Sequence, residues 1–170
     1  MIVPRSSQDN LGKWLSHWRY NKVKKEITPP FLDIACGDNL LRKKLNGGFG
    51  VDVTNYGNAD IIVKDFSCLP LKADTFNSVA IVASLNYFEN PASVLTECVR
   101  VLKPDGLLVI TMINPFLGKV WHFFRESWAV YPGFSYLQIK TYMKGLPLHF
   151  QKESRFMLGM NQLYVFKKNG

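Results

Sequence analysis

The chain of 170 residues is long enough for one domain with a buried core, and 47% hydrophobic and 20% charged residues are typical of a globular protein. Its three cysteines, Cys36, Cys68 and Cys98, are too few and too widely spaced for a disulfide framework or a CxxC metal knuckle, so neither disulfides nor a metal are expected. The apolar runs are too short to cross a bilayer, and residues 1–5 do not begin a signal peptide. We therefore expect a cytoplasmic protein, with peripheral attachment to a membrane as the alternative.

The net charge of +8 is unevenly distributed along the chain. Residues 1–30 carry +4 and residues 116–170 carry +6, whereas residues 31–115 carry −2. Basic ends around a slightly acidic centre favour a ligand-binding centre whose flanks contact an anionic partner, such as an anionic membrane surface. The alternative is that the basic residues form an ordinary solvated surface.

The first predicted element is an amphipathic helix over residues 11–26, which Pro29 and Pro30 prevent from continuing. Its basic residues, among them Arg19, are expected to face solvent. The apolar residues of the face that is expected to be buried are Leu11, Trp14, Leu15 and Trp18.

Short apolar segments then alternate with helices or loops, which is typical of a parallel sheet covered on both faces. A short helix follows Asn39, and a longer one begins at Pro91 behind an Asn90 cap. Residues 103–106, Lys-Pro-Asp-Gly, predict a tight turn. The five predicted strands are Phe31–Ile34, Phe49–Val53, Asp60–Lys64, Asn77–Ala83 and Leu107–Ile113.

The last third of the chain predicts two more helices and a closing antiparallel pair of strands. We therefore expect an α/β fold of the Rossmann-like, doubly wound class, with a mostly parallel sheet and a C-terminal antiparallel pair. The predicted elements are helices over 117–128 and 136–144 and strands over 150–157 and 161–168. The single domain of residues 1–170 divides into an N-terminal basic helix (1–30), a ligand-binding core (31–116) and substrate-side helices with closing strands (117–170).

Polar residues recur where the first four predicted strands end, at Asp33, Asp52, Asp65 and residues 84–87. Ligands of open parallel sheets bind at this edge. Asp33 and Asp52 lie nineteen residues apart, close to the roughly 20-residue offset between a glycine-type loop and an acid that binds ribose hydroxyls. The small residues of the Ala35–Asn39 turn let the backbone approach a ligand closely.

Four segments in this region have the order and spacing of known motifs. They are Leu32–Asp38 (compare D-x-G-C-G-x-G), Gly50–Asp52 (G-V-D), Lys64–Val79 (D-x-x-x-L-P-[FL]…D-x-S-F-D-x-V) and Arg100–Leu108 (R-V-L-K-P-G-G-x-L). From about residue 31 to residue 116 the chain thus resembles the class I S-adenosylmethionine-dependent methyltransferases, in particular the small type 11 group. The resemblance implies S-adenosylmethionine as the cofactor and methyl transfer to a small or a glycan- or lipid-linked acceptor.

The resemblance also implies roles for individual residues. Asp33 would orient the methionine end of the cofactor, Asp52 would bind its ribose, and Asp65 with the Phe66 backbone would bind adenine. The other residues expected at the cofactor are Ala35, Cys36, Gly37, Asn39, Ser84 and Leu85.

The chain departs from the family's pattern in the cofactor turn and between the second and third strands, among other places. Ala35 and Asn39 replace glycines of the first motif, and asparagine is the residue other than glycine that best tolerates a positive φ. Only residues 54–59 separate the second and third strands, too few for the usual crossover helix. That side of the sheet is therefore either open or covered by a partner chain, which makes a homodimer a candidate.

Methyl transfer is an in-line displacement in which the protein mainly positions the reactants, with a base only if an acceptor proton must leave. Asn86, Tyr87 and His122 are the candidates for catalysis. Two alternative functions stay open. One is an RNA or protein methyltransferase, although the aromatic residues beside the basic ones make nucleic acid the less expected partner. The other is a non-catalytic cofactor-binding module that acts as a dimer or partner subunit. The cofactor motifs do not identify the acceptor.

Overall fold

The structure, a computed structural model, describes residues 10–117 and 133–170. The predicted helix over 117–128 and His122 lie almost wholly outside the described residues. The strands are β1 (Phe31–Ile34), β2 (Gly48–Asp52), β3 (Ile61–Ile62), β4 (Phe76–Val82), β5 (Leu102–Ile113), β6 (Leu148–Phe156) and β7 (Asn161–Lys168). The helices are α1 (Asn10–Val23), α2 (Leu40–Lys44), the 3-10 helix η1 (Leu85–Tyr87), α3 (Pro91–Val101) and α5 (Tyr136–Tyr142).

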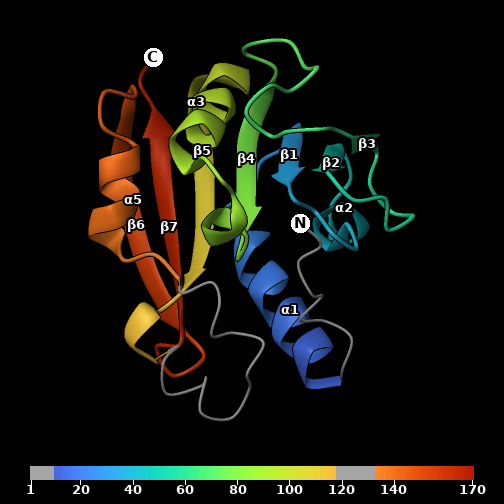
Figure 1. Cartoon of the computed structure of the whole chain (residues 1–170), viewed down its shortest axis with the longest axis vertical. Coiled ribbons are helices and arrows are strands. Elements are labelled where there is room, and N and C mark those ends of the chain that lie inside the picture. Colours follow the sequence, from blue (N-terminus) through green and yellow to red (C-terminus); the bar gives the residue numbers. More distant parts are fainter. Residues whose placement is uncertain (1–9, 118–132) are drawn as a thin grey trace.

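These strands form one sheet in the order β3-β2-β1-β4-β5-β7-β6 (Figure 1). Neighbours from β3 to β5 are parallel, and β7 is antiparallel to both β5 and β6. The expected α/β, Rossmann-like class with a C-terminal antiparallel pair is therefore confirmed. Within the described stretches, no helix is both long and apolar enough to cross a membrane.

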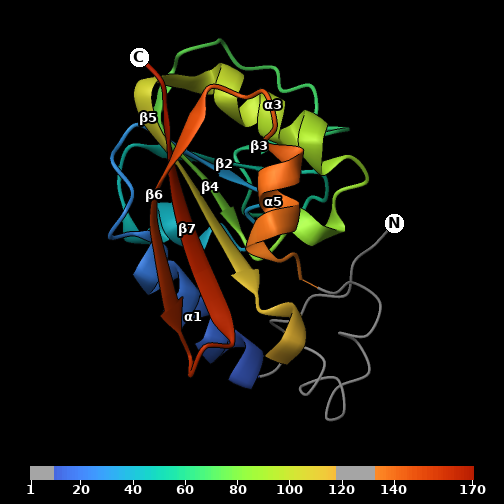
Figure 2. The same ribbon diagram turned by 90° about the vertical axis from the view of Figure 1, so that its left-hand side faces the viewer.

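Helices cover both faces of the sheet (Figure 2), which explains why the central strands β1 and β4 are almost wholly buried. Helices α1 and α2 pack on one face through residues such as Val23 and Leu41, both fully buried. On the other face α3 and α5 contribute Leu95 and Ile139, also fully buried. The loops at the strand ends are thus held between two separate apolar cores.

The buried face of α1 differs from the prediction. Leu15 is buried as expected, but Trp14 and Trp18 are 56% and 36% exposed and stack edge-to-face with ring centroids 5.0 Å apart. The side chains of Arg19 and Tyr20 are buried instead. The helix is rotated by about one residue, or about 100°, from the expected orientation, because a face through Leu15, Tyr20 and Val23 fits the sheet.

Two local details concern the ends of α3. Asn90 caps its N-terminus as predicted, accepting a hydrogen bond from the Ser93 N–H at 3.1 Å, and Pro91 is the first helical residue. The turn predicted for residues 103–106 is instead an irregularity inside β5, between the residues that pair with Phe76 and Ser78 of β4. β5 therefore begins at Leu102, five residues before the predicted start.

Candidate active site

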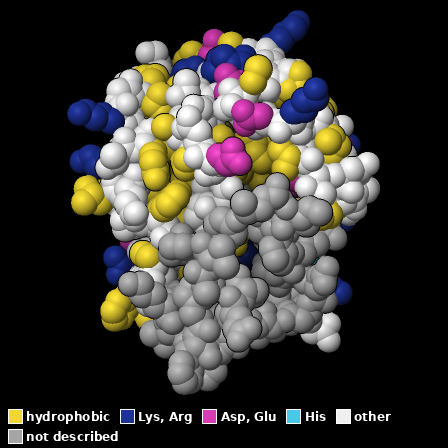
Figure 3. Space-filling view, viewed as in Figure 1, with side chains coloured by type: hydrophobic (Ala, Val, Ile, Leu, Met, Phe, Trp, Pro, Cys, Tyr) yellow, Lys and Arg dark blue, Asp and Glu magenta, His cyan; other side chains and the backbone are white. Residues whose placement is uncertain are grey.

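The strand order reverses between β1 and β4, so the loops after these two strands border the crevice in which open α/β sheets bind ligands. Asp33 lies near the end of β1, Asp52 ends the adjacent β2, and Ser84 follows β4. On the face of the molecule seen in Figure 3, acidic side chains lie among apolar ones near the middle, and Lys and Arg side chains lie mostly at the periphery.

The turn between β1 and α2 exposes its backbone to this crevice. Ala35, Gly37 and Asn39 all have positive φ, at 56°, 52° and 52°, so Asn39 adopts the backbone expected of it. A Cβ built on Gly37 would meet no atom within 4 Å, so the backbone there faces open space. The Cys36 N–H donates to the Val51 carbonyl at 3.1 Å, which fixes the turn to β2. The turn therefore leaves room for a ligand against its backbone.

Asp33 is a buried carboxyl group without a normal partner. It is fully buried, and neither carboxylate oxygen has a hydrogen bond of normal geometry from the described residues, although the Tyr20 hydroxyl lies beside the carboxyl group. Burial raises the pKa of Asp33 to about 8; the neighbouring Tyr20 hydroxyl opposes the shift and the Asp52 carboxylate adds to it. Unpaired buried carboxyl oxygens are rare because they cost free energy, so this group fits a ligand that donates to it or carries positive charge.

Asp52 connects the turn to the loop after β2. One carboxylate oxygen accepts from the Gly37 N–H at 2.8 Å and the other from the Thr54 N–H at 3.1 Å. A carboxylate has about four acceptor positions, so two remain for the hydroxyls of a ligand. Asp52 therefore both orders the glycine turn and presents acceptors beside it.

The side chain of Asn39 has a role that the sequence did not reveal. Its amide nitrogen donates to the Asn58 carbonyl at 2.9 Å and to an Asp60 oxygen at 3.0 Å. The same Asp60 oxygen accepts from the Gly50 N–H at 2.8 Å, and the other pairs with Arg42. A Cβ at Gly50 would overlap the Asn39 amide. This cluster, called here the Asn39–Asp60 link, joins the turn to the short β2–β3 connection.

Asp65 and Phe66, expected at adenine, lie in the loop after β3. The Asp65 carboxylate is exposed and accepts hydrogen bonds from the Ser67 hydroxyl and N–H, which lower the pKa of Asp65. Phe66 is buried, and its ring packs against Phe88 with centroids 5.0 Å apart. The Phe66 side chain therefore anchors the loop, and Asp65 stays at the surface near the end of β3.

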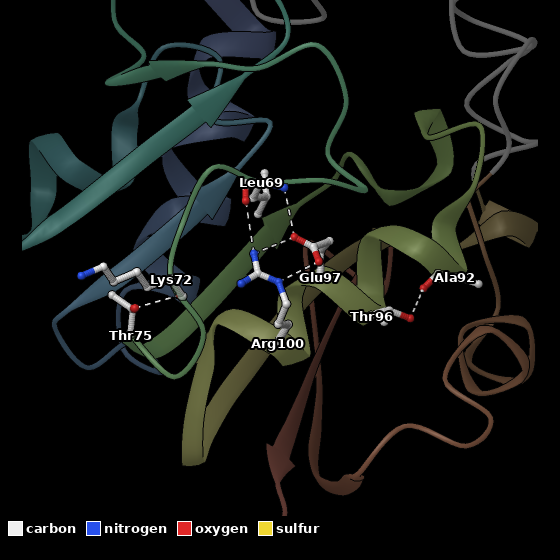
Figure 4. Close-up of polar contacts among 7 residues, drawn as sticks. All are labelled: Leu69, Lys72, Thr75, Ala92, Thr96, Glu97 and Arg100. Atoms are coloured by element: carbon white, nitrogen blue, oxygen red, sulfur yellow. Dashed lines mark hydrogen bonds and ion pairs between the residues drawn. The ribbon is translucent and has the colours of Figure 1, made fainter.

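Two residues of α3 hold the far end of this loop (Figure 4). One Glu97 oxygen accepts from the Leu69 N–H at 3.0 Å, and Arg100 donates to the Leu69 carbonyl at 3.2 Å. Arg100 also pairs with Glu97 at 2.8 Å, and this hydrogen bond lowers the pKa of Glu97. Arg100, the first residue of the fourth motif, therefore holds the loop that carries Asp65 against α3.

The residues after β4 contribute a mixed apolar and polar rim. Leu85 is fully buried, and the buried Ser84 hydroxyl has no hydrogen-bonding partner among the described residues. Asn86 and Tyr87 are half-buried in η1, so two of the three candidates for catalysis lie together at this strand end. Burial raises the pKa of the Cys36 thiol, so this cysteine remains protonated and is a poor nucleophile.

Arg19 is the second residue that sequence reasoning missed. Only 7% of it is exposed, and its Nε donates to the Asn161 side-chain oxygen at 3.0 Å, at the start of β7. No carboxylate of the described residues forms an ion pair with it. The sequence gave no signal of this burial, because the basic residues of the helix were predicted to face solvent.

Comparisons with known proteins agree with this geometry. Residues 32–110 match the family model described as "Methyltransferase domain". Among curated relatives are a demethylmenaquinone methyltransferase of Thermotoga maritima, 32% identical over 81 residues (45% of this chain, 35% of that enzyme), and the rice 2-methyl-6-phytyl-1,4-hydroquinone methyltransferase 1, 33% identical over 75 residues (43% and 22%). The chain spans less than two thirds of the length of the curated relatives it matches.

A solved structure shares the fold over nearly the whole chain. It is a SAM-dependent methyltransferase of Thermotoga maritima, with a TM-score of 0.74 and 18% identity, covering 92% of this chain and 89% of that one. The match extends beyond the region of sequence similarity to the C-terminal strands. The unpaired carboxyl of Asp33, the open backbone at Gly37 and the free acceptor positions of Asp52 all fit a ligand with an ammonium group and ribose hydroxyls.

Proposed function

We propose that this chain is a class I S-adenosylmethionine-dependent methyltransferase that transfers a methyl group to a small or lipid-linked acceptor. The match of residues 32–110 to the methyltransferase family model and the shared fold support this proposal. The observation that carries the proposal is the buried, unpaired Asp33 carboxyl beside the positive-φ turn at the point where the strand order reverses. S-adenosylmethionine, the cofactor of the family, supplies an electrophilic methyl group on a sulfonium sulfur when bound.

The chain's own residues would bind and orient this cofactor. Asp33 would accept from its ammonium group, the backbone of residues 35–39 would line its methionine part, and Asp52 would accept from ribose hydroxyls. The Phe66 backbone and Asp65 would border adenine, held in place by Glu97 and Arg100. Ser84 and Leu85 would pack near the cofactor at the end of β4.

The remaining chemistry is positioning of the acceptor and exclusion of water. Asn86 and Tyr87 follow β4, so they are placed to contact the acceptor. Methyl transfer needs a base only where the acceptor must lose a proton in the reaction. We assign Tyr87 and Asn86 to acceptor contact rather than to proton transfer.

The proposed acceptor is linked to a lipid. Of the two named relatives, one acts, by its name, on a demethylmenaquinone and the other on a hydroquinone with a phytyl chain. On this chain the Trp14–Trp18 pair is exposed on a basic helix, and exposed apolar side chains also follow β5 at Phe116 and precede β7 at Leu158. Aromatic side chains beside lysines favour contact with an anionic lipid surface.

One observation favours the alternative in which the chain works with a partner subunit. β3 has only two residues, no helix joins it to β2, and Phe49, Val53 and Ile62 are about half exposed along this edge. One solved structure with this fold is a complex of a methyltransferase with an activator protein, Trm112 of Haloferax volcanii (TM-score 0.74, 17% identity, covering 97% of this chain and 94% of that one). A chain inactive by itself but active with a second subunit would favour this reading.

Binding of S-adenosylhomocysteine tests the proposal. At a ligand concentration of about 100 times Kd, the melting temperature should rise by roughly 5–10 °C, since such a ligand adds about 2.7 kcal/mol. Asp52→Ala removes a charge-assisted acceptor and should weaken binding by about 10- to 100-fold, whereas Asp105→Ala, far from the site, should not. Stabilisation by NADH but not by S-adenosylhomocysteine would reject the cofactor assignment.

A further inference from the structure

Arg19 is a buried cation whose partner is missing from the described residues. Its pKa is lowered because burial removes water from the guanidinium. Among the described contacts, only Nε has a hydrogen bond, to the neutral Asn161 side chain. A buried charge without a counter-charge costs free energy, and groups whose pKa is perturbed in this way cluster at functional sites.

The environment of Arg19 orients it for a ligand. The Asn161 amide nitrogen donates to the Met157 sulfur at 3.0 Å, so its oxygen is turned toward Arg19. Asn161 is itself only 3% exposed, so its hydrogen bond with Nε holds the Arg19 guanidinium in one orientation. Asn161 pairs with Ile113 at the end of β5, and β5 lies next to β4, so the guanidinium lies at the same edge of the sheet as the residues after β4. The two terminal nitrogens remain to bind a planar oxyanion side by side.

The position of Arg19 favours contact with the acceptor over contact with the cofactor. Its hydrogen-bonding partner starts β7, which is three strands from β1 in the sheet order, or about 14 Å at about 4.8 Å per strand. The proposed cofactor turn follows β1. Among the described residues Asp33 and Arg19 form no ion pair, although Tyr20, the residue of α1 after Arg19, is a neighbour of Asp33.

We propose that Arg19 binds an oxyanion of the methyl acceptor, a carboxylate or a phenolate, in a subsite bounded by α1, the rim after β4 and the start of β7. This inference rests on the proposed function and deepens it, because it limits the acceptor to molecules that carry negative charge on oxygen. The unpaired Ser84 hydroxyl at the same strand end is a further donor for such a group.

Two pairs of probes test the subsite: benzoate with benzyl alcohol, and 4-nitrophenolate with 4-nitroanisole. Each is titrated by calorimetry into the full chain, with and without S-adenosylhomocysteine. The wild-type chain should prefer the anion of at least one pair by about 10- to 100-fold, and Arg19→Met should abolish the preference while leaving the neutral probe unchanged. The two pairs separate a carboxylate from a phenolate acceptor.

Asn161→Asp is the matched variant, because it keeps Arg19 but supplies the missing carboxylate from the chain itself. It should raise the melting temperature of the ligand-free protein and abolish the anion preference. Arg19→Met should not lower that melting temperature, since it removes an unpaired buried charge.

Three results would overturn the inference. One is a wild-type chain without preference for either anion. Another is a loss of S-adenosylhomocysteine affinity in Arg19→Met comparable to the loss of anion affinity, which would assign the guanidinium to the cofactor. The third is a lower melting temperature of Arg19→Met with unchanged anion preference, which would make Arg19 a cross-link between α1 and β7. Failure of S-adenosylhomocysteine to bind the wild-type chain refutes the proposed function separately, because the probe titrations without it still report on Arg19.

Discussion

Replacing Asp33 by asparagine should stabilise the ligand-free protein at neutral pH. The substitution Asp33→Asn keeps the shape of the side chain and removes its ability to ionise. In the folded protein the pKa of Asp33 is raised to about 8 by burial, from an ordinary value of 3.8. Between these two pH values the folded chain holds a proton that the unfolded chain has released, so stability falls as pH rises through this range.

The slope of this loss follows from the pKa alone. One pKa unit corresponds to about 1.4 kcal/mol, so the wild-type chain should lose about 3 kcal/mol of unfolding free energy between about pH 5 and pH 7. For a chain of this length that is a fall in melting temperature of roughly 6–12 °C. Asp65 and Glu97 have lowered pKa values, so their stabilisation is lost only at more acidic pH and does not mask the trend.

The assay is chemical denaturation in a series of buffers, on protein dialysed free of ligand. Asp33→Asn should show a flat profile over this range and exceed the wild-type stability at pH 7, and it should bind S-adenosylhomocysteine more weakly. Asp105→Asn changes an exposed carboxylate paired with Lys167 and should keep the wild-type slope. A wild-type profile that is flat from pH 5 to 8 would show that Asp33 is ionised and paired, and would refute the reasoning.

Two further predictions concern the Asn39–Asp60 link and the exposed tryptophans. Asn39→Gly suits the positive φ but removes two hydrogen bonds, so it should lower the unfolding free energy by about 1–3 kcal/mol in denaturant titrations. The control Asn46→Gly, in the exposed turn before β2, should have little effect. Equal stability of Asn39→Gly and the wild-type chain would contradict the link. The double substitution Trp14→Ala and Trp18→Ala should reduce co-sedimentation with phosphatidylglycerol vesicles by at least about tenfold, and salt should weaken the remaining binding. The control Leu137→Ala, on the other face, should leave co-sedimentation unchanged. An unchanged bound fraction in the tryptophan variant would count against a membrane-facing α1.

The order of strands and the ligand-binding edge could be predicted because they depend on local signals. Continuous apolar runs identify buried strands, and the small residues of the Ala35–Asn39 turn mark the place where backbone approaches a ligand. The missing crossover between β2 and β3 could also be predicted, since it follows from the number of residues available. These features are fixed by neighbours in sequence.

The side-chain partners could not be predicted, because they depend on packing across the sheet. Helical spacing gives an apolar stripe on α1 but not its rotation, and the tryptophans favoured the wrong face. Asn39 could be assigned its backbone conformation, yet its amide contacts lie nineteen and twenty-one residues away in the β2–β3 connection. The burial of Arg19 depends on a strand 142 residues further along the chain.

The Asn39–Asp60 link also determines which parts of the chain open together. No helix covers this edge, and the turn after β1 and the β2–β3 connection are joined by the hydrogen bonds of Asn39 and Asp60. They should therefore exchange their amide hydrogens as one unit, faster than the paired centre of β4, β5 and β7. A ligand that touches only the turn would slow exchange at Asp60 as well, so that protection reaches the edge of the sheet without any contact there.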